Sequence, residues 1–185
     1  MESFNFGTFL KKVYYYQNMK KVAVCLLLMV VASHVLPAQS PKHQSVFIYS
    51  FTRYVIWPDS YNISDFEILV LGDSPVLTEL KAMAQAKKVG ERNIKVTKIN
   101  SVTEIRKANM IFVPAGRSAD IEAVVAKVNN LSILIITEEP GLGVKGSDIN
   151  FIVKDGKLAF ELNQPAMNRQ NLKASTELSR LAIMI

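Results

Sequence analysis

Short apolar runs that alternate with helical segments dominate the middle of this sequence. The runs at 66–71, 110–113 and 132–137 end in polar or turn-forming residues, and the first two lead into segments with helical spacing at 76–88 and 119–129. Runs that are apolar at successive positions are typical of strands in a parallel sheet that helices cover on both faces. The order of these segments therefore predicts an α/β domain with a mainly parallel central sheet.

The remaining segments complete a three-layer, Rossmann-like α/β domain with about six strands. Helical spacing predicts a first helix over 43–57, which Pro58 ends, and a long final helix with an apolar stripe that begins at Gln164. Between them we expect a half-covered or edge strand, a short helix with a capping box, and a C-terminal β-hairpin closed by an Asp-Gly turn. In chain order these three elements occupy 94–99, 101–107 and 149–162.

A basic and apolar leader precedes this domain. Two lysines come before an apolar run at 22–32, which is shorter than the roughly 20 residues of a membrane span, and small residues follow. We expect Met19 to be the true start, residues 1–38 to hold an N-terminal extension and a signal peptide cleaved near Ala38, and 39–185 to be one exported, periplasmic domain. An uncleaved N-terminal anchor is the alternative.

Removal of the leader would also remove charge and the only thiol. Its four lysines and one glutamate carry +3 of the net charge of +6, and Cys25 lies in its apolar run, so the domain would hold no disulfide. The basic residues that remain are scattered, which argues against nucleic acid as a partner. His43 is the only remaining histidine, and no serine stands in a G-x-S-x-G motif. We therefore predict no catalytic residue, no metal and no cofactor.

An acidic metal site is the one enzymatic alternative that the residues leave open. Asp73 follows the first strand, and Glu138 and Glu139 follow the fourth, so these carboxylates could meet at one edge of the sheet and hold Mg²⁺. Asp73 within Gly-Asp-Ser-Pro more simply caps a turn.

Candidate binding residues fall in two places. The first holds Tyr54, Trp57 and Pro58, in an aromatic segment for which helical spacing favours core packing. Trp57 stands where the first helix breaks, so it could instead be partly exposed and act as an anchor for a ligand or a protein partner. The second place is the loop after the fourth strand, whose sequence GLGVKG at 141–146 matches G-x-G-x-x-G. That motif needs a following helix to bind a dinucleotide, whereas here it leads into the predicted hairpin, so we expect a mobile binding loop. Its candidate residues are Glu138, Glu139, Gly141 and Gly143.

Four segments in a characteristic order carry a family resemblance. They read FTRYVIWP at 51–58, ILVLGDSP at 68–75, then 150–163 and 172–182. Together they resemble the YfiR-like family of exported regulatory proteins over about 45–185. The resemblance implies a periplasmic protein that restrains a membrane-bound partner, a diguanylate cyclase in the best-known members, and it brings no catalytic residues.

The chain departs from the better-known members in its cysteines. Ala108-Asn109-Met110 stands where those members approach the third strand with a cysteine, so the resemblance does not extend to redox control. We predict a non-enzymatic regulator that binds and restrains a membrane-bound signalling partner of the diguanylate cyclase or sensor kinase type, through Trp57, Pro58 and the 138–148 loop. The alternative is a periplasmic module that senses a small molecule at the same sheet edge. A homodimer is compatible with both.

Overall fold

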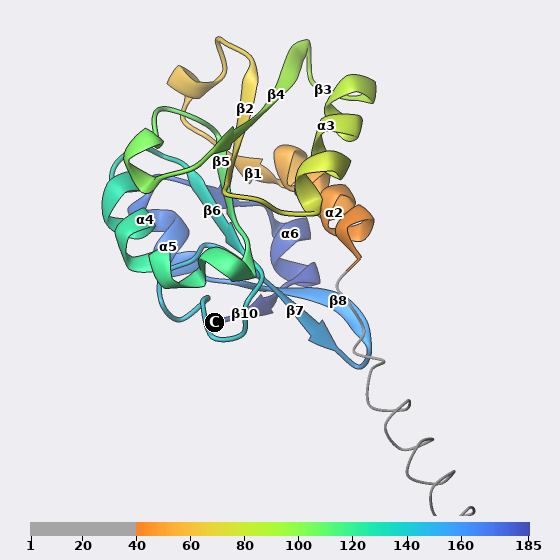
Figure 1. The fold of residues 1–185 in the computed structure, drawn as a ribbon, viewed down its shortest axis with the longest axis vertical. Coiled ribbons are helices and arrows are strands. Elements are labelled where there is room, and N and C mark those ends of the chain that lie inside the picture. Colours follow the sequence, from red (N-terminus) through yellow and green to blue (C-terminus); the bar gives the residue numbers. More distant parts are fainter. Residues whose placement is uncertain (1–39) are drawn as a thin grey trace, which may run out of the picture. The chain divides into compact units, whose positions relative to one another are not determined.

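An eight-stranded sheet forms the centre of the computed structural model, which describes residues 40–185 (Figure 1). The expected leader and its cleavage near Ala38 lie outside the described residues. Five neighbouring strands, β4, β2, β5, β6 and β7, run parallel, and β8 forms an antiparallel hairpin with β7. This confirms the predicted mainly parallel sheet with a C-terminal hairpin. In spatial order the strands are β10 (Ile183–Met184), β8 (Lys157–Leu162), β7 (Ile149–Lys154), β6 (Leu134–Thr137), β5 (Met110–Val113), β2 (Phe66–Leu71), β4 (Arg92–Ile99) and β3 (Lys88–Val89).

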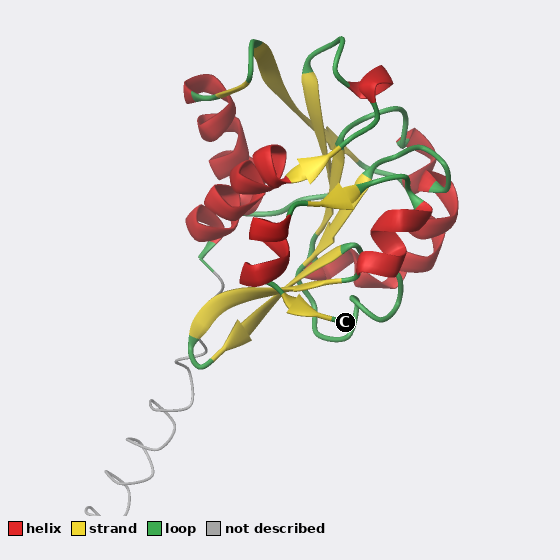
Figure 2. Cartoon of the chain, turned by 180° about the vertical axis from the view of Figure 1, so that it is seen from behind, coloured by secondary structure: helices red, strands yellow, loops and turns green. Residues whose placement is uncertain are grey.

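Each central strand sends alternate side chains into two separate cores. In β2, Ile68 and Val70 lie in one core, whereas Leu69 and Leu71 lie in the other. Helices cover both faces of the sheet, which gives the predicted three layers (Figures 1 and 2). Because both faces are covered, the strands read as continuous apolar runs. The first core includes residues of α2 (Pro41–Tyr54), α3 (Val76–Ala86) and α6 (Thr176–Leu181), and the second includes residues of α4 (Ile121–Val128).

The order of the strands reverses direction between β2 and β5. From β2 the chain passes through α3 to β4 on one side, then returns to β5 on the other side of β2 and continues through α4 to β6. In open parallel sheets, ligands bind beyond the carboxyl ends of the strands at such a switch point. The topology therefore singles out the end of the sheet that follows β2, β5 and β6.

The first helix ends at Tyr54, three residues before the predicted end at Trp57. The next two residues form β1 (Val55–Ile56), which pairs antiparallel with β9 (Lys173–Ala174). Pro58 does stop helical structure, but pairing with a strand more than 100 residues away had already ended it. This contact is long-range, so the local pattern did not reveal it.

The single long helix predicted from Gln164 is wrong. The segment instead forms α5 (Gln164–Arg169), then β9, then α6. Asn171 takes a φ of +57° after α5, and the Ser175 hydroxyl caps α6 by accepting a hydrogen bond from the Leu178 amide at 3.2 Å. Met167 and Leu178 both reach the first core, which explains why their spacing resembled one apolar stripe.

The helices predicted over 101–107 and 119–129 have fewer helical residues than expected, while the hairpin is as predicted. The 101–107 segment contains only the 3₁₀ turn η2 (Val102–Glu104). The helix predicted over 119–129 is α4, which starts only at Ile121, after the 3₁₀ segment η3 (Ala115–Asp120). In the hairpin, Asp155 and Gly156 have φ of +51° and +71°, as a two-residue type I′ turn requires. Among residues 40–185, no helix is both long and apolar enough to cross a bilayer.

Candidate functional site

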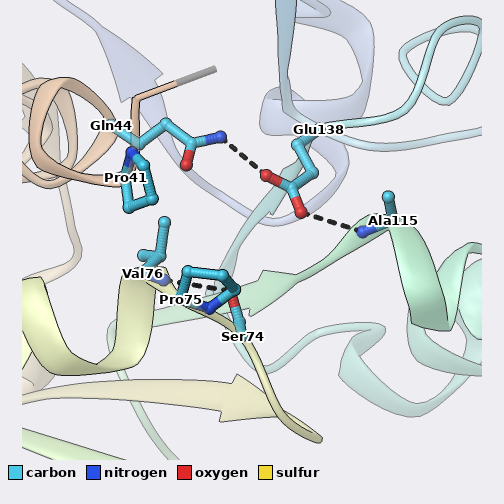
Figure 3. Close-up of a pocket in the computed structure, with 7 residues that line it drawn as sticks. All are labelled: Pro41, Gln44, Ser74, Pro75, Val76, Ala115 and Glu138. Carbon is cyan, nitrogen blue, oxygen red and sulfur yellow. Dashed lines mark hydrogen bonds between the residues drawn. The ribbon is translucent and has the colours of Figure 1, made fainter. Parts of the chain in front are cut away.

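A cavity of about 310 Å³ opens at the switch point of the sheet (Figure 3). The first turn of α2, the turn from β2 into α3, the end of β5 and the end of β6 each contribute to its wall. Segments that are far apart in the sequence therefore meet here because the parallel strands share one carboxyl edge. The lining residues are Pro41, Gln44, Ser74, Pro75, Val76, Ala115 and Glu138.

Glu138 connects three of these walls. One carboxylate oxygen accepts a hydrogen bond from Gln44 Nε2 at 2.6 Å, and the other accepts one from the backbone amide of Ala115 at 3.0 Å (Figure 3). Hydrogen bonds to a charged group are worth about 1.5–3 kcal/mol each. Glu138 therefore ties the start of α2 to the ends of β5 and β6 across the cavity.

The rest of the lining is apolar or neutral. Pro75 and Val76 open α3, and the Ser74 hydroxyl accepts a hydrogen bond from the Val76 amide at 3.2 Å. Two helices thus begin at the cavity, and the partial positive charge of their N-termini faces the one carboxylate in the lining. Such a wall can hold a small polar molecule or a partner's side chain through hydrogen bonds and apolar contact.

Trp57 is buried, so the expected exposed anchor is wrong for this residue and core packing is what the structure shows. Its side chain is 7% exposed, its Nε1 donates to the Asn109 carbonyl at 3.1 Å, and its ring meets Phe66 edge-on at 5.2 Å. The strand β1 carries the chain from the end of α2 to this position, so the break in the helix before Pro58 does not expose the side chain.

The expected joint patch of Trp57, Pro58 and the 138–148 loop does not form. Asn109, the partner of Trp57, immediately precedes β5, whereas Glu138 follows β6, so the two groups lie at opposite ends of the parallel strands. Tyr54 and Pro58 are half-buried, and the Tyr54 carbonyl accepts a hydrogen bond from the Ser175 amide at 2.8 Å.

The glycine loop at 141–146 does not line the cavity and forms no phosphate-binding turn. It leads into β7 and not into a helix, as predicted. Gly141 is exposed with a φ of +84°, but Gly143 is buried, and a Cβ there would lie 2.5 Å from Ile185 Cδ1. The Gly143 carbonyl also accepts a hydrogen bond from Asn163 Nδ2 at 2.9 Å. Glu139 is half-buried and does not line the cavity.

Comparison with known families decides what kind of domain this is. The model of the YfiR/HmsC-like family matches residues 41–183, from the first turn of α2 into β10. The chain belongs to the YfiR/HmsC-like family. This confirms the resemblance seen in the sequence. The family is known for periplasmic regulation of diguanylate cyclase and is regulatory rather than catalytic. No curated protein matches the chain.

A buried polar network holds the glycine loop of this YfiR/HmsC-like domain against the sheet. Thr137, Ser147 and Asn150 are completely buried. Thr137 Oγ1 donates to Asn150 Oδ1 at 2.7 Å, Ser147 Oγ donates to the Ile149 carbonyl at 2.7 Å, and Asn150 Nδ2 donates to Glu161 at 2.9 Å. Sequence reasoning missed these residues, although small polar residues at the ends of apolar strands were the available signal.

Asp148 is the most perturbed ionisable group that the structure describes. Its side chain is completely buried immediately before β7, where Oδ2 accepts a hydrogen bond from the Ile135 amide at 2.7 Å. Within residues 40–185, Oδ1 has no partner. Burial raises the pKa of this carboxyl to about 7, and the Ile135 amide and the charge of Arg169 oppose that rise.

The carboxylates considered for Mg²⁺ do not meet. Asp73 is exposed and pairs with Lys98 Nζ at 2.5 Å, while Glu138 bonds to Gln44 and Ala115. In the described part of the chain, no three His, Cys, Asp or Glu side chains gather as metal ligands would.

Proposed function

We propose that this chain is an exported regulator that binds and restrains a membrane-bound signalling protein of the diguanylate cyclase or sensor kinase type. The family match carries this proposal, because it covers the domain from 41 to 183 and the family regulates such an enzyme. The basic and apolar leader supports export, with cleavage near Ala38 and a periplasmic location for the domain. The regulator would act through its surface and need no cofactor.

The cavity edge is the surface that we assign to binding. Glu138 joins α2 to the ends of β5 and β6, so a contact there would act on three elements at once. Glu139, Gly141 and Gly143 lie on the loop that leaves this edge. The buried Trp57 supports the fold and is no longer part of the proposed contact surface.

Co-production with a membrane-bound diguanylate cyclase that has a periplasmic sensory segment tests the proposal. We expect the full chain to lower cellular cyclic di-GMP, measured by mass spectrometry, relative to cells that hold the cyclase alone. The matched control lacks residues 1–38 and would stay in the cytoplasm, so it should leave the cyclic di-GMP level unchanged. If the full chain lowers the activity of none of a panel of such cyclases and sensor kinases, the proposed restraint is wrong. If the control without residues 1–38 restrains the partner equally well, the proposed export is wrong.

Sensing of a small molecule is the second candidate, and the cavity at the switch point is the observation that favours it. A ligand at about 100 times its Kd should raise the free energy of unfolding by about 2.7 kcal/mol. We expect a screen of metabolites by thermal shift to find such a ligand, and Ala115→Phe, which fills the cavity, to abolish the shift. Ala119→Phe, on the exposed part of η3 outside the cavity, is the matched control. A shift that survives Ala115→Phe would place the ligand elsewhere.

A further inference from the structure

The β7–β8 hairpin extends beyond the sheet with both of its outer edges open (Figures 1 and 2). β6 pairs only with Ile149 and Asn150 of β7, and β10 pairs only with Glu161 and Leu162 of β8. These pairings also engage the Phe151 amide, with β6, and the Phe160 carbonyl, with β10, because a parallel bridge uses the groups of the flanking residues. Within the described residues, the rest of the segment 151–160 pairs only within the hairpin. We call this segment the arm. An open edge of this kind is a template for an added strand.

The hydrogen bonds at the base of the arm show which backbone groups point outward. The Asp148 carbonyl faces β8, because it accepts a hydrogen bond from the Asn163 amide at 2.9 Å. Backbone groups alternate between the two sides of a strand, so those of Phe151 and Val153 face away from β8. On β8 the Leu162 carbonyl faces outward to the Ile185 amide at 3.1 Å, so the groups of Leu158 also face outward. The arm thus offers unpaired donors and acceptors along both edges.

Two lysines that form no ion pair with the described residues lie at the tip of the arm. Lys154 and Lys157 lie directly opposite each other on either side of the turn, and both are exposed. Neither forms an ion pair with another described residue. Like charges at directly opposite positions destabilise a strand pair. A negatively charged side chain beside Lys154 would relieve this repulsion.

The other open edge of the sheet, on β4, is different in this respect. There Lys95 lies 3.9 Å from Glu67, and Lys98 lies 2.5 Å from Asp73. Each of these lysines of β4 thus has a carboxylate of the domain beside it, although Glu67 also pairs with Arg106 at 2.5 Å. The charge of the arm is left for something outside the described chain.

We propose that the β7 edge of the arm accepts an extended acidic segment of a protein partner as an added strand. Main-chain hydrogen bonds to the Phe151 carbonyl and to the amide and carbonyl of Val153 would hold the segment, and an acidic residue would lie beside Lys154. Val153 is 40% exposed and adds apolar contact. The β7 edge is favoured because it continues past the end of β6, where Glu138 forms the cavity wall, so the two surfaces adjoin. The inference rests on the proposed function in that the segment belongs to the regulated protein.

Titration with a short peptide of alternating glutamate and valine tests the added strand directly. We expect saturable changes in the backbone amide NMR signals of Ile152, whose nitrogen is bonded to the Phe151 carbonyl carbon, and of Val153. Binding should be at least about tenfold weaker for the same peptide with lysine in place of glutamate, a difference of about 1.4 kcal/mol. Equal binding of the two peptides, no binding of the acidic peptide, or changes confined to other residues would overturn the proposal.

A pair of proline variants distinguishes the two edges. Val153→Pro removes an outward amide on β7, whereas Leu158→Pro removes one on β8, and proline is tolerated at such edge positions. We expect the first variant to bind the acidic peptide at least about tenfold more weakly, and the second to bind as the native protein does. The opposite result would overturn the assignment to β7.

Lys154→Glu supplies a second test that does not depend on proline. It replaces a like-charge pair by an opposite-charge pair with Lys157, so Tm should rise while binding of the acidic peptide is lost. Unchanged peptide binding would overturn the role of this lysine. Restraint of the cyclase that persists in a variant without peptide binding would refute the docking site alone, and peptide binding without restraint of any partner would refute the proposed function alone.

Discussion

Replacement of Asp148 by asparagine should remove a specific part of the pH dependence of stability. The ordinary pKa of an aspartate is about 4, and burial raises that of Asp148 to about 7. Between these two values the folded protein keeps a proton that the unfolded chain releases, so rising pH favours unfolding. The contribution of this group is complete below about pH 4 and is lost as pH rises through the folded pKa near 7.

The magnitude follows from the same two values. One pKa unit corresponds to about 1.4 kcal/mol, so Asp148 should lower the free energy of unfolding by about 4 kcal/mol from acidic to neutral pH. Asparagine keeps an oxygen for the Ile135 amide but does not titrate. Its buried amide nitrogen costs about 1–3 kcal/mol at every pH. This cost cancels when the difference between variant and native protein is followed across pH.

Chemical denaturation at a series of pH values measures this difference. We expect the stability of Asp148→Asn relative to the native protein to rise by about 4 kcal/mol between about pH 4 and pH 8. Asp155→Asn, which changes an exposed aspartate in the hairpin turn, is the matched control and should follow the native profile. If the Asp148→Asn and native profiles run parallel, the buried carboxyl is not protonated in the folded state and the reasoning fails.

Three further substitutions test the remaining structural assignments by chemical denaturation. Trp57→Ala should cost about 3–5 kcal/mol, as expected of a core aromatic, and a loss below about 1 kcal/mol would contradict its burial. Glu138→Ala should cost about 1–3 kcal/mol and lower amide exchange protection at the start of η3, whereas Glu139→Ala should do neither. Gly143→Ala should cost about 1–3 kcal/mol, because the new Cβ would lie 2.5 Å from Ile185 Cδ1 and 2.8 Å from Glu161 Oε2. Ile185→Ala removes the first of these contacts and should restore part of the loss; a loss unaffected by Ile185→Ala would contradict that contact.

Strand periodicity and turn chemistry anticipated the central elements of the fold. The runs at 66–71 and 110–113 form β2 and β5 with the predicted bounds, because they face a core on both sides whatever their neighbours are. The Asp155-Gly156 turn was equally clear, since both residues tolerate positive φ. Elements that depend on distant partners were missed, above all β1 and β9, which end one helix and divide another.

The candidate site was predicted only in part. Glu138 was named because it follows a strand at the carboxyl edge, and that rule holds for any parallel sheet. Gln44 and Ala115, its hydrogen-bond partners, were missed because they lie 94 and 23 residues away along the chain. Trp57 was named as a candidate contact because it stands at a helix break, but a distant strand pairs there and the side chain lies in the core that helical spacing favoured.

The sequence by itself determined the class of the domain and its family. The informative features were continuous apolar runs, an Asp-Gly turn and the order of four segments. Each can be read directly from neighbouring residues, so no knowledge of distant contacts is needed. Tertiary structure decided which side chains meet: Trp57 with Asn109, Glu138 with Gln44, and Asp148 with a buried amide. It also decided which strand edges stay open. These outcomes depend on how distant segments pack, and the free energy of packing is set by contacts that no single stretch of the chain contains.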